Sequence, residues 1–288
     1  MNRNHDIEED EIRIVGGRSA AKRIPRWAYI VAALLLLAVV LLLTLRTCGS
    51  GTNPAKGTVP PPADETLPAA EATLWHENLD PARPSCLVVS DTFIDSLHLQ
   101  IFTPLNALPE LHLGPLDTAD TTILFAAMAA DLRRDNGKIV GAFVMAGEPL
   151  SWGLSKRGYC AIIDGRIALG TADNSPLFEQ ATEQGGYFFR QYPAVADGHW
   201  VPNNPENASF RRALCLLDGK VCIVACSDRV LMNDFSIALS ALGATQALFL
   251  VGGTSDGWYR NSDGSLSRLG TSYARNTKYM NYIVFRKQ

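Results

Sequence analysis

The residues best suited to chemistry lie in one stretch, 247–260, which reads Ala-Leu-Phe-Leu-Val-Gly-Gly-Thr-Ser-Asp-Gly-Trp-Tyr-Arg. A short apolar run here gives way to glycines and hydroxyl groups, which is typical of a buried strand that ends in a turn. Gly252 and Gly253 allow the backbone to approach a ligand closely and to direct N–H groups at an anion. Ser255 adds a hydroxyl group. The stretch therefore predicts an anion-binding turn, with an ordinary strand-to-loop connection as the alternative.

Two hairpins are predicted to precede this turn. They contain Asp164-Gly165 within residues 159–169 and Asp218-Gly219 within residues 213–225. Asp-Gly between apolar runs favours a two-residue hairpin loop, because both turn residues adopt positive φ. Counting outward from the second turn places Cys215 opposite Cys222. A cross-strand disulfide and a pair of buried thiols are the two alternatives there.

A helix is predicted over residues 233–243, with Asn233 as its N-cap and Gly243 as its end. Residues 120–134 are ambiguous, because Asp120 suits a helix start whereas the apolar and β-branched run that follows it suits a strand. The order of hairpin, helix, strand and turn predicts an α+β fold. We expect a mixed, mainly antiparallel sheet with packed helices, preceded by one N-terminal transmembrane helix.

The N-terminal part of the chain contains that apolar segment, residues 27–45, which carries no charged side chain. As a helix it would span roughly 28 Å at about 1.5 Å per residue, enough for the core of a bilayer. Lys22, Arg23 and Arg26 precede it, which predicts a single-pass protein of the inner (cytoplasmic) membrane with its N-terminus in the cytoplasm. The length of the segment and the acidic tail before it favour an uncleaved anchor over a cleaved signal peptide.

Composition divides the chain into a cytoplasmic tail (1–26), the transmembrane anchor (27–45), a Pro/Gly-rich linker (46–71) and a periplasmic or otherwise extracytoplasmic domain (72–288). The net charge of −3 and the lack of a basic stripe argue against nucleic-acid binding. The sequence contains no Cys-x-x-Cys pair and no Walker A, dinucleotide-binding or His-Glu-x-x-His motif. We therefore expect no cofactor and no metal ion.

The order of several short segments resembles the phosphodiester glycosidase family. These segments are Phe-Arg-Arg-Ala-Leu-Cys at 210–215, the Asp218-Gly219 turn, the helix at 233–243 and Phe-Leu-Val-Gly-Gly-Thr-Ser at 249–255. The family includes N-acetylglucosamine-1-phosphodiester alpha-N-acetylglucosaminidase. Residues 222–224 and 258–260 look similar to a divergent Bacteroidetes-type branch. The resemblance covers the chain from about residue 118 to its C-terminus.

The chain departs from the family pattern at three places. Val251 stands where the family has an Asp, and Thr254 stands where it has a third Gly. Residues 126–130, which are Ala-Ala-Met-Ala-Ala, stand in place of an Asn-Gly-Gly-Phe-Phe element. A fold can survive such changes although an activity is lost.

The resemblance implies hydrolysis of a sugar–phosphate diester at the anomeric carbon. The site would need an anion cradle and a carboxylate, because the leaving phosphate monoester is already a weak base. Asp256, with Asp228 as an alternative, would replace the missing carboxylate, Arg212 or Arg260 would pair with phosphate, and Trp258 would stack on a sugar or simply close the core. The predicted site comprises catalytic Asp256 and Arg212, and ligand-binding Gly252, Gly253, Ser255, Trp258 and Arg260.

Two functions follow from this site. The first is a membrane-anchored, exported hydrolase that cleaves sugar–phosphodiester linkages of envelope glycans. The second is a catalytically inactive module on the same fold that binds glycan or a protein partner. The replacement of the motif Asp by Val251 favours the second function, whereas Arg212 and the glycines favour a retained ligand site.

Overall fold

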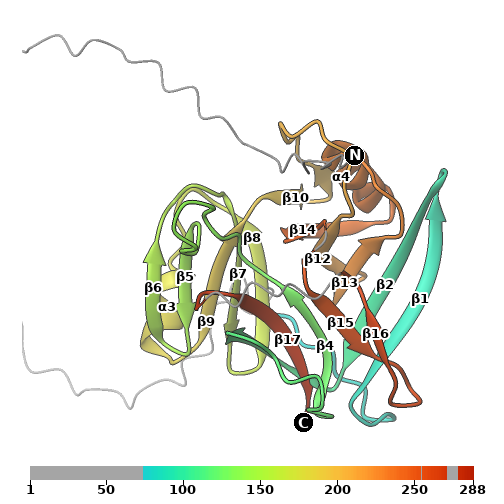
Figure 1. Cartoon of the computed structure of the whole chain (residues 1–288), viewed down its shortest axis with the longest axis horizontal. Coiled ribbons are helices and arrows are strands. Elements are labelled where there is room, and N and C mark those ends of the chain that lie inside the picture. The colour runs from blue at the N-terminus through green and yellow to red at the C-terminus, as the bar shows by residue number, and fades with distance from the viewer. Residues whose placement is uncertain (1–73, 254, 271–277) are drawn as a thin grey trace, which may run out of the picture. The chain divides into compact units, whose positions relative to one another are not determined.

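The computed structural model describes residues 74–253, 255–270 and 278–288, which belong to one compact unit, Leu67–Gln288 (Figure 1). The tail, the apolar segment 27–45 and the whole linker predicted from the sequence lie outside the described residues. None of the helices in the described ranges has the length and apolar character needed to cross a bilayer.

Three antiparallel sheets make up the described domain. The first has the strand order β1 (Cys86–Ile94), β2 (Leu97–Leu105), β13 (Lys220–Cys226), β12 (Arg212–Leu217), β14 (Ala244–Leu250), β10 (Pro193–Ala196) and β11 (His199–Trp200). The second has the order β16 (Leu266–Arg268), β15 (Gly257–Arg260), β4 (Ile123–Met128), β17 (Asn281–Lys287) and β3 (Ala107–Leu113). The third has the order β6 (Glu148–Trp152), β5 (Ala142–Met145), β9 (Tyr187–Gln191), β7 (Gly158–Ile163) and β8 (Arg166–Thr171).

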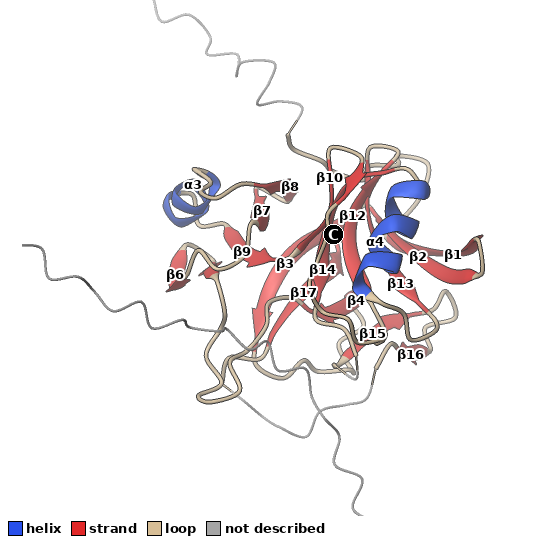
Figure 2. Ribbon diagram, turned by 90° about the horizontal axis from the view of Figure 1, so that it is seen from above, coloured by secondary structure: helices blue, strands red, loops and turns tan. Residues whose placement is uncertain are grey.

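The three sheets share one apolar core, to which nearly every central strand contributes. Phe102 of β2, Phe125 of β4 and Phe189 of β9 are fully buried within it. The seven-stranded sheet is also covered on its other face, where Phe235 of helix α4 (Met232–Ala241) packs near Phe249 of β14 (Figure 2). Burial on both faces explains why the central strands are continuous apolar runs and do not alternate with polar residues.

Both predicted hairpins are present. Asp164 and Asp218 adopt φ of 50°, and the glycines that follow them also have positive φ, as a tight hairpin loop requires. Cys215 lies directly opposite Cys222 in the pairing of β12 with β13. Both side chains are buried free thiols, so the second of the two alternatives holds in this structure.

The expected α+β class with packed helices is wrong for the described part of the chain, which is built mostly of antiparallel strands. The two described helices are short: α3 (Leu177–Glu183) has 7 residues and α4 has 10. The ambiguous segment 120–134 contains strand β4, which pairs with β15 and β17 and buries its side chains on both faces of the sheet. Helix α4 lies where the sequence predicts a helix, but Asn233 is inside it and the N-cap is Leu231.

Candidate functional site

The glycine-rich turn after β14 packs against two other segments. The Val251 amide donates to the Met128 carbonyl at the end of β4 (3.1 Å), and the Gly253 amide donates to the Phe210 carbonyl (2.7 Å). A Cβ atom at position 252 would clash with the same Phe210 carbonyl, and Gly253 has φ of 63°. Close packing and backbone geometry therefore explain both glycines without a ligand.

Arg212 lies beside this turn, at the start of β12 and opposite Leu250 of β14. Its guanidinium is buried and donates to the Ser255 hydroxyl (3.0 Å) and the Ser255 carbonyl (3.3 Å). It also donates to the Leu269 carbonyl. Burial lowers the pKa of Arg212 to about 10, so the side chain remains cationic at neutral pH. The structure thus brings Arg212 and Ser255 together, as the sequence predicts.

The donors in this region point mainly at carbonyl oxygens. Besides the Gly253 amide, the Ser255 amide donates to the Gly252 carbonyl (3.2 Å), and the Ser255 hydroxyl donates to the Val251 carbonyl (2.6 Å). Arg212 also donates to carbonyl oxygens, and its bonds to Ser255 and Leu269 connect the turn to the segment after β16. An anion at this position would have to displace contacts that stabilise the turn.

Asp256 is the carboxylate nearest to the turn, and two side chains orient it. Tyr282 of β17 donates its hydroxyl group to Asp256 Oδ2 (3.2 Å), and Arg268 of β16 lies 3.4 Å from Oδ1. Burial, and then the negative charge of Asp256, raise the pKa of Tyr282, so the phenol stays neutral and donates. The Asp256 side chain is 15% exposed and that of Arg268 is 46% exposed, which leaves this pair within reach of solvent. The alternative carboxylate, Asp228, is exposed after β13.

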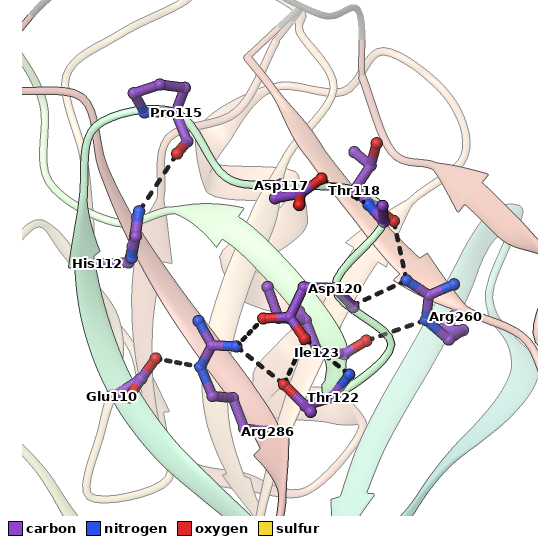
Figure 3. Close-up of polar contacts among 11 residues, drawn as sticks. Glu110, His112, Pro115, Asp117, Thr118, Asp120, Thr122, Ile123, Arg260 and Arg286 are labelled. Carbon is purple, nitrogen blue, oxygen red and sulfur yellow. Dashed lines mark hydrogen bonds and ion pairs between the residues drawn. The ribbon is translucent and has the colours of Figure 1, made fainter.

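The structure places Trp258 and Arg260 in supporting positions. Trp258 is fully buried, so its ring closes the core and has no face available to a sugar. Arg260 lies 5.7 Å from the Trp258 ring and donates to the carbonyls of Thr118 (3.0 Å), Asp120 (3.0 Å) and Ile123 (3.3 Å) (Figure 3). These contacts fasten the loop before β4, whereas Arg212 fastens the turn after β14.

A buried lysine forms a second polar cluster that the sequence analysis missed. The Lys156 ammonium group donates to Gln191 Oε1 (2.6 Å) and to the Asp131 carboxylate, and it lies 4.8 Å from the Tyr192 ring centroid. Burial lowers the pKa of Lys156, and the charge of Asp131 partly opposes that effect. Its partners are 25 and 35 residues away in sequence, so no local sequence pattern predicts the cluster.

Comparisons with known proteins reveal a fold relationship. No family model and no curated protein sequence matches the chain. Among solved structures, the zebrafish N-acetylglucosamine-1-phosphodiester alpha-N-acetylglucosaminidase catalytic domain, auto-inhibited by its pro-peptide, is similar with a TM-score of 0.53 and 12% identity. The similarity covers 78% of this chain and 92% of that one. A hypothetical protein from Synechocystis has a TM-score of 0.48 and 15% identity, covering 70% of this chain and 62% of that one. The described domain is thus distantly similar in fold to a phosphodiester glycosidase catalytic domain.

Proposed function

We propose that the domain hydrolyses a phosphodiester-linked sugar, with Asp256 as the reacting carboxylate. The observation that carries this proposal is the arrangement around Asp256, a partly exposed carboxylate fixed by Tyr282 and Arg268 next to the buried Arg212. The distant similarity in fold to a phosphodiester glycosidase catalytic domain supports the reaction class.

The arrangement suits the chemistry of such a diester. The leaving phosphate monoester is a weak base and needs little help from a general acid, so a carboxylate at the anomeric carbon is the main requirement. Tyr282 would hold Asp256 in one orientation, and the exposed Arg268 would bind the phosphate. Arg212, whose donors are occupied, would contribute its positive charge through the turn.

A catalytically silent glycan-binding module is the second candidate, and Val251 favours it. Val251 stands at the position of the family's Asp and packs with the apolar cluster that contains Trp258 and Tyr282. Arg212 and the amides of Val251, Gly253 and Ser255 already donate to protein oxygens. On this reading the fold is kept while the reacting group is lost.

The two candidates are separated by assaying the full-length protein with sugar-1-phosphate diesters. Hydrolysis predicts release of free sugar, at least about a hundredfold slower in Asp256→Asn, because the substituted amide is neither a nucleophile nor an anion. The matched control is Asp228→Asn, which removes an exposed carboxylate and should leave the rate unchanged. Unfolding curves of both variants should match that of the wild type. Turnover that survives in Asp256→Asn contradicts the proposal, and binding without turnover supports the silent module.

A further inference from the structure

The loop that follows β4 is a small, internally bonded hairpin, residues 131–140. Leu132 pairs with Ile139, and the Arg133 amide donates to the Lys138 carbonyl (2.8 Å). At its base, the Asp131 carboxylate accepts a hydrogen bond from the buried Lys156. Hydrogen bonds therefore hold the backbone of the loop along its length and at its base.

A hollow of about 530 Å³ lies between this loop, strand β6 and Tyr279. That volume falls in the range of small-molecule sites. Asn136 and Ser151 supply an amide and a hydroxyl group, and Tyr279 supplies a phenol. Leu150 supplies apolar surface, whereas Ile139 is buried beneath the hollow with 6% of its surface exposed. Apolar and aromatic patches together with a few polar groups suit a sugar ring, which has both apolar faces and hydroxyl groups.

The charged residues at the hollow are cationic. Arg133 and Lys138 line it, and the Lys278 ammonium group lies 5.5 Å from the Tyr279 ring. The lining residues that the structure describes include no carboxylate. Asp135 lies 3.2 Å from the Nε atom of Arg133, but this pair is well exposed and so contributes little energy. The local field therefore favours an anion.

The hollow and the proposed reacting carboxylate are connected through the start of β17. Tyr279 precedes Tyr282, the partner of Asp256, by three residues, and the two side chains pack against different apolar clusters. Asn281, between them, joins the two regions because its side chain accepts from the Ala130 amide (2.7 Å) and donates to the Tyr279 carbonyl (3.2 Å).

We infer that this hollow is a subsite for the negatively charged group of an anionic saccharide. The negative charge of the ligand is inferred from the hollow alone. That the ligand is a saccharide rests on the proposed function. The subsite recognises a sugar unit away from the bond that reacts, so it contributes affinity and selects charged glycans over neutral ones.

The test is calorimetric titration of the full-length protein with tetragalacturonate and with its neutral methyl ester, in a neutral detergent. We expect tetragalacturonate to bind at least tenfold more tightly than the ester and to lose affinity as salt is added, because screening weakens contacts between exposed charges. In the double variant Arg133→Gln/Lys138→Gln that preference should disappear. Inorganic phosphate alone should bind more weakly than tetragalacturonate, because it makes no contact with the apolar part of the hollow.

The matched control is Arg157→Gln/Lys220→Gln, which removes the same charge. Arg157 forms an exposed ion pair with Asp173 (2.7 Å), as Arg133 does with Asp135, and Lys220 is exposed at the start of β13. The control should bind tetragalacturonate like the wild type. Equal affinity for acid and ester, unchanged affinity in Arg133→Gln/Lys138→Gln, or phosphate binding as tight as the saccharide would each overturn the inference. Asp256→Asn should keep this binding, so failure of the subsite and failure of the hydrolase give different results.

Discussion

At the scale of single residues, arginine side chains in this domain act chiefly as connectors of main-chain segments. Arg190, Arg212 and Arg260 each donate to carbonyls from several parts of the chain, such as the Lys156 (2.7 Å) and Ala172 (2.9 Å) carbonyls that Arg190 binds. A guanidinium suits this role because it offers five donors in a planar fork. An arginine near a glycine-rich turn is consequently weak evidence for an anion site until its partners are known.

Asp120 provides a pH-dependent contact of the same kind. Its carboxylate accepts from the Thr122 hydroxyl (2.7 Å) and amide (2.9 Å) and pairs with Arg286, and these contacts lower its pKa from 3.8 to about 2. A carboxyl group with a depressed pKa stabilises the folded state above pH 3.8, and this contribution is lost as the pH falls toward 2. In Asp120→Asn, we expect the free energy of unfolding at pH 7 to fall by about 1 kcal/mol, since the site is partly exposed.

Urea denaturation at several pH values measures this effect. The difference in unfolding free energy between the wild type and Asp120→Asn should shrink between pH 4 and pH 2. A difference that stays constant over that interval would show that Asp120 does not stabilise the protein through its charge.

At the scale of elements, strand β4 organises the region of the site, because the segments at both of its ends carry functional or bracing residues. The loop before it is held by Arg260 from β15 and by Arg286 from β17 (Figure 3). The end of the strand bonds to the turn after β14 and leads into the 131–140 loop. Displacement of β4 would therefore disturb Asp256 and the hollow together.

Replacement of Arg260 tests this bracing. Arg260→Gln should lower the free energy of unfolding by about 2 kcal/mol, because carbonyls at 118, 120 and 123 lose charged donors. Amide hydrogen exchange should accelerate in residues 118–123. The control, Arg83→Gln, removes an exposed ion pair with Asp80 and should change stability by less than about 0.5 kcal/mol. Equal stability of the two variants would show that Arg260 does not brace the loop.

At the scale of the whole molecule, the described domain is joined by pairings between distant parts of the chain. Strand β17 pairs with both β3 and β4, and β2 pairs with β13. The residues of the proposed site lie in the C-terminal part of the chain. They come together only when β17 has paired with β3 and β4 in the second sheet.

The location of this domain stays a prediction of the sequence, based on the positive charges before residues 27–45. Protease added to the outside of spheroplasts that express the chain should degrade residues 72–288, whereas a cytoplasmic marker protein should survive. Protection of the domain until the cells are lysed would contradict the predicted orientation.

The sequence by itself determined the features that depend on local backbone conformation. The Asp-Gly turns required positive φ and so defined two hairpins. The second turn also defined the strand register that places Cys215 opposite Cys222. Helix α4 and the strand before the glycine-rich turn were also predictable, and the family resemblance implied that Arg212 and Ser255 share a site, where the structure has them in contact.

Only the tertiary structure decided what depends on burial and on partners far away in sequence. Pairing with β15 and β17 made residues 123–128 a strand, and complete burial made Trp258 part of the core. The Lys156 cluster and the hollow at Arg133 bring together segments separated by tens of residues. Local preferences of a few residues cannot encode such contacts, because they form only when three sheets close on one core.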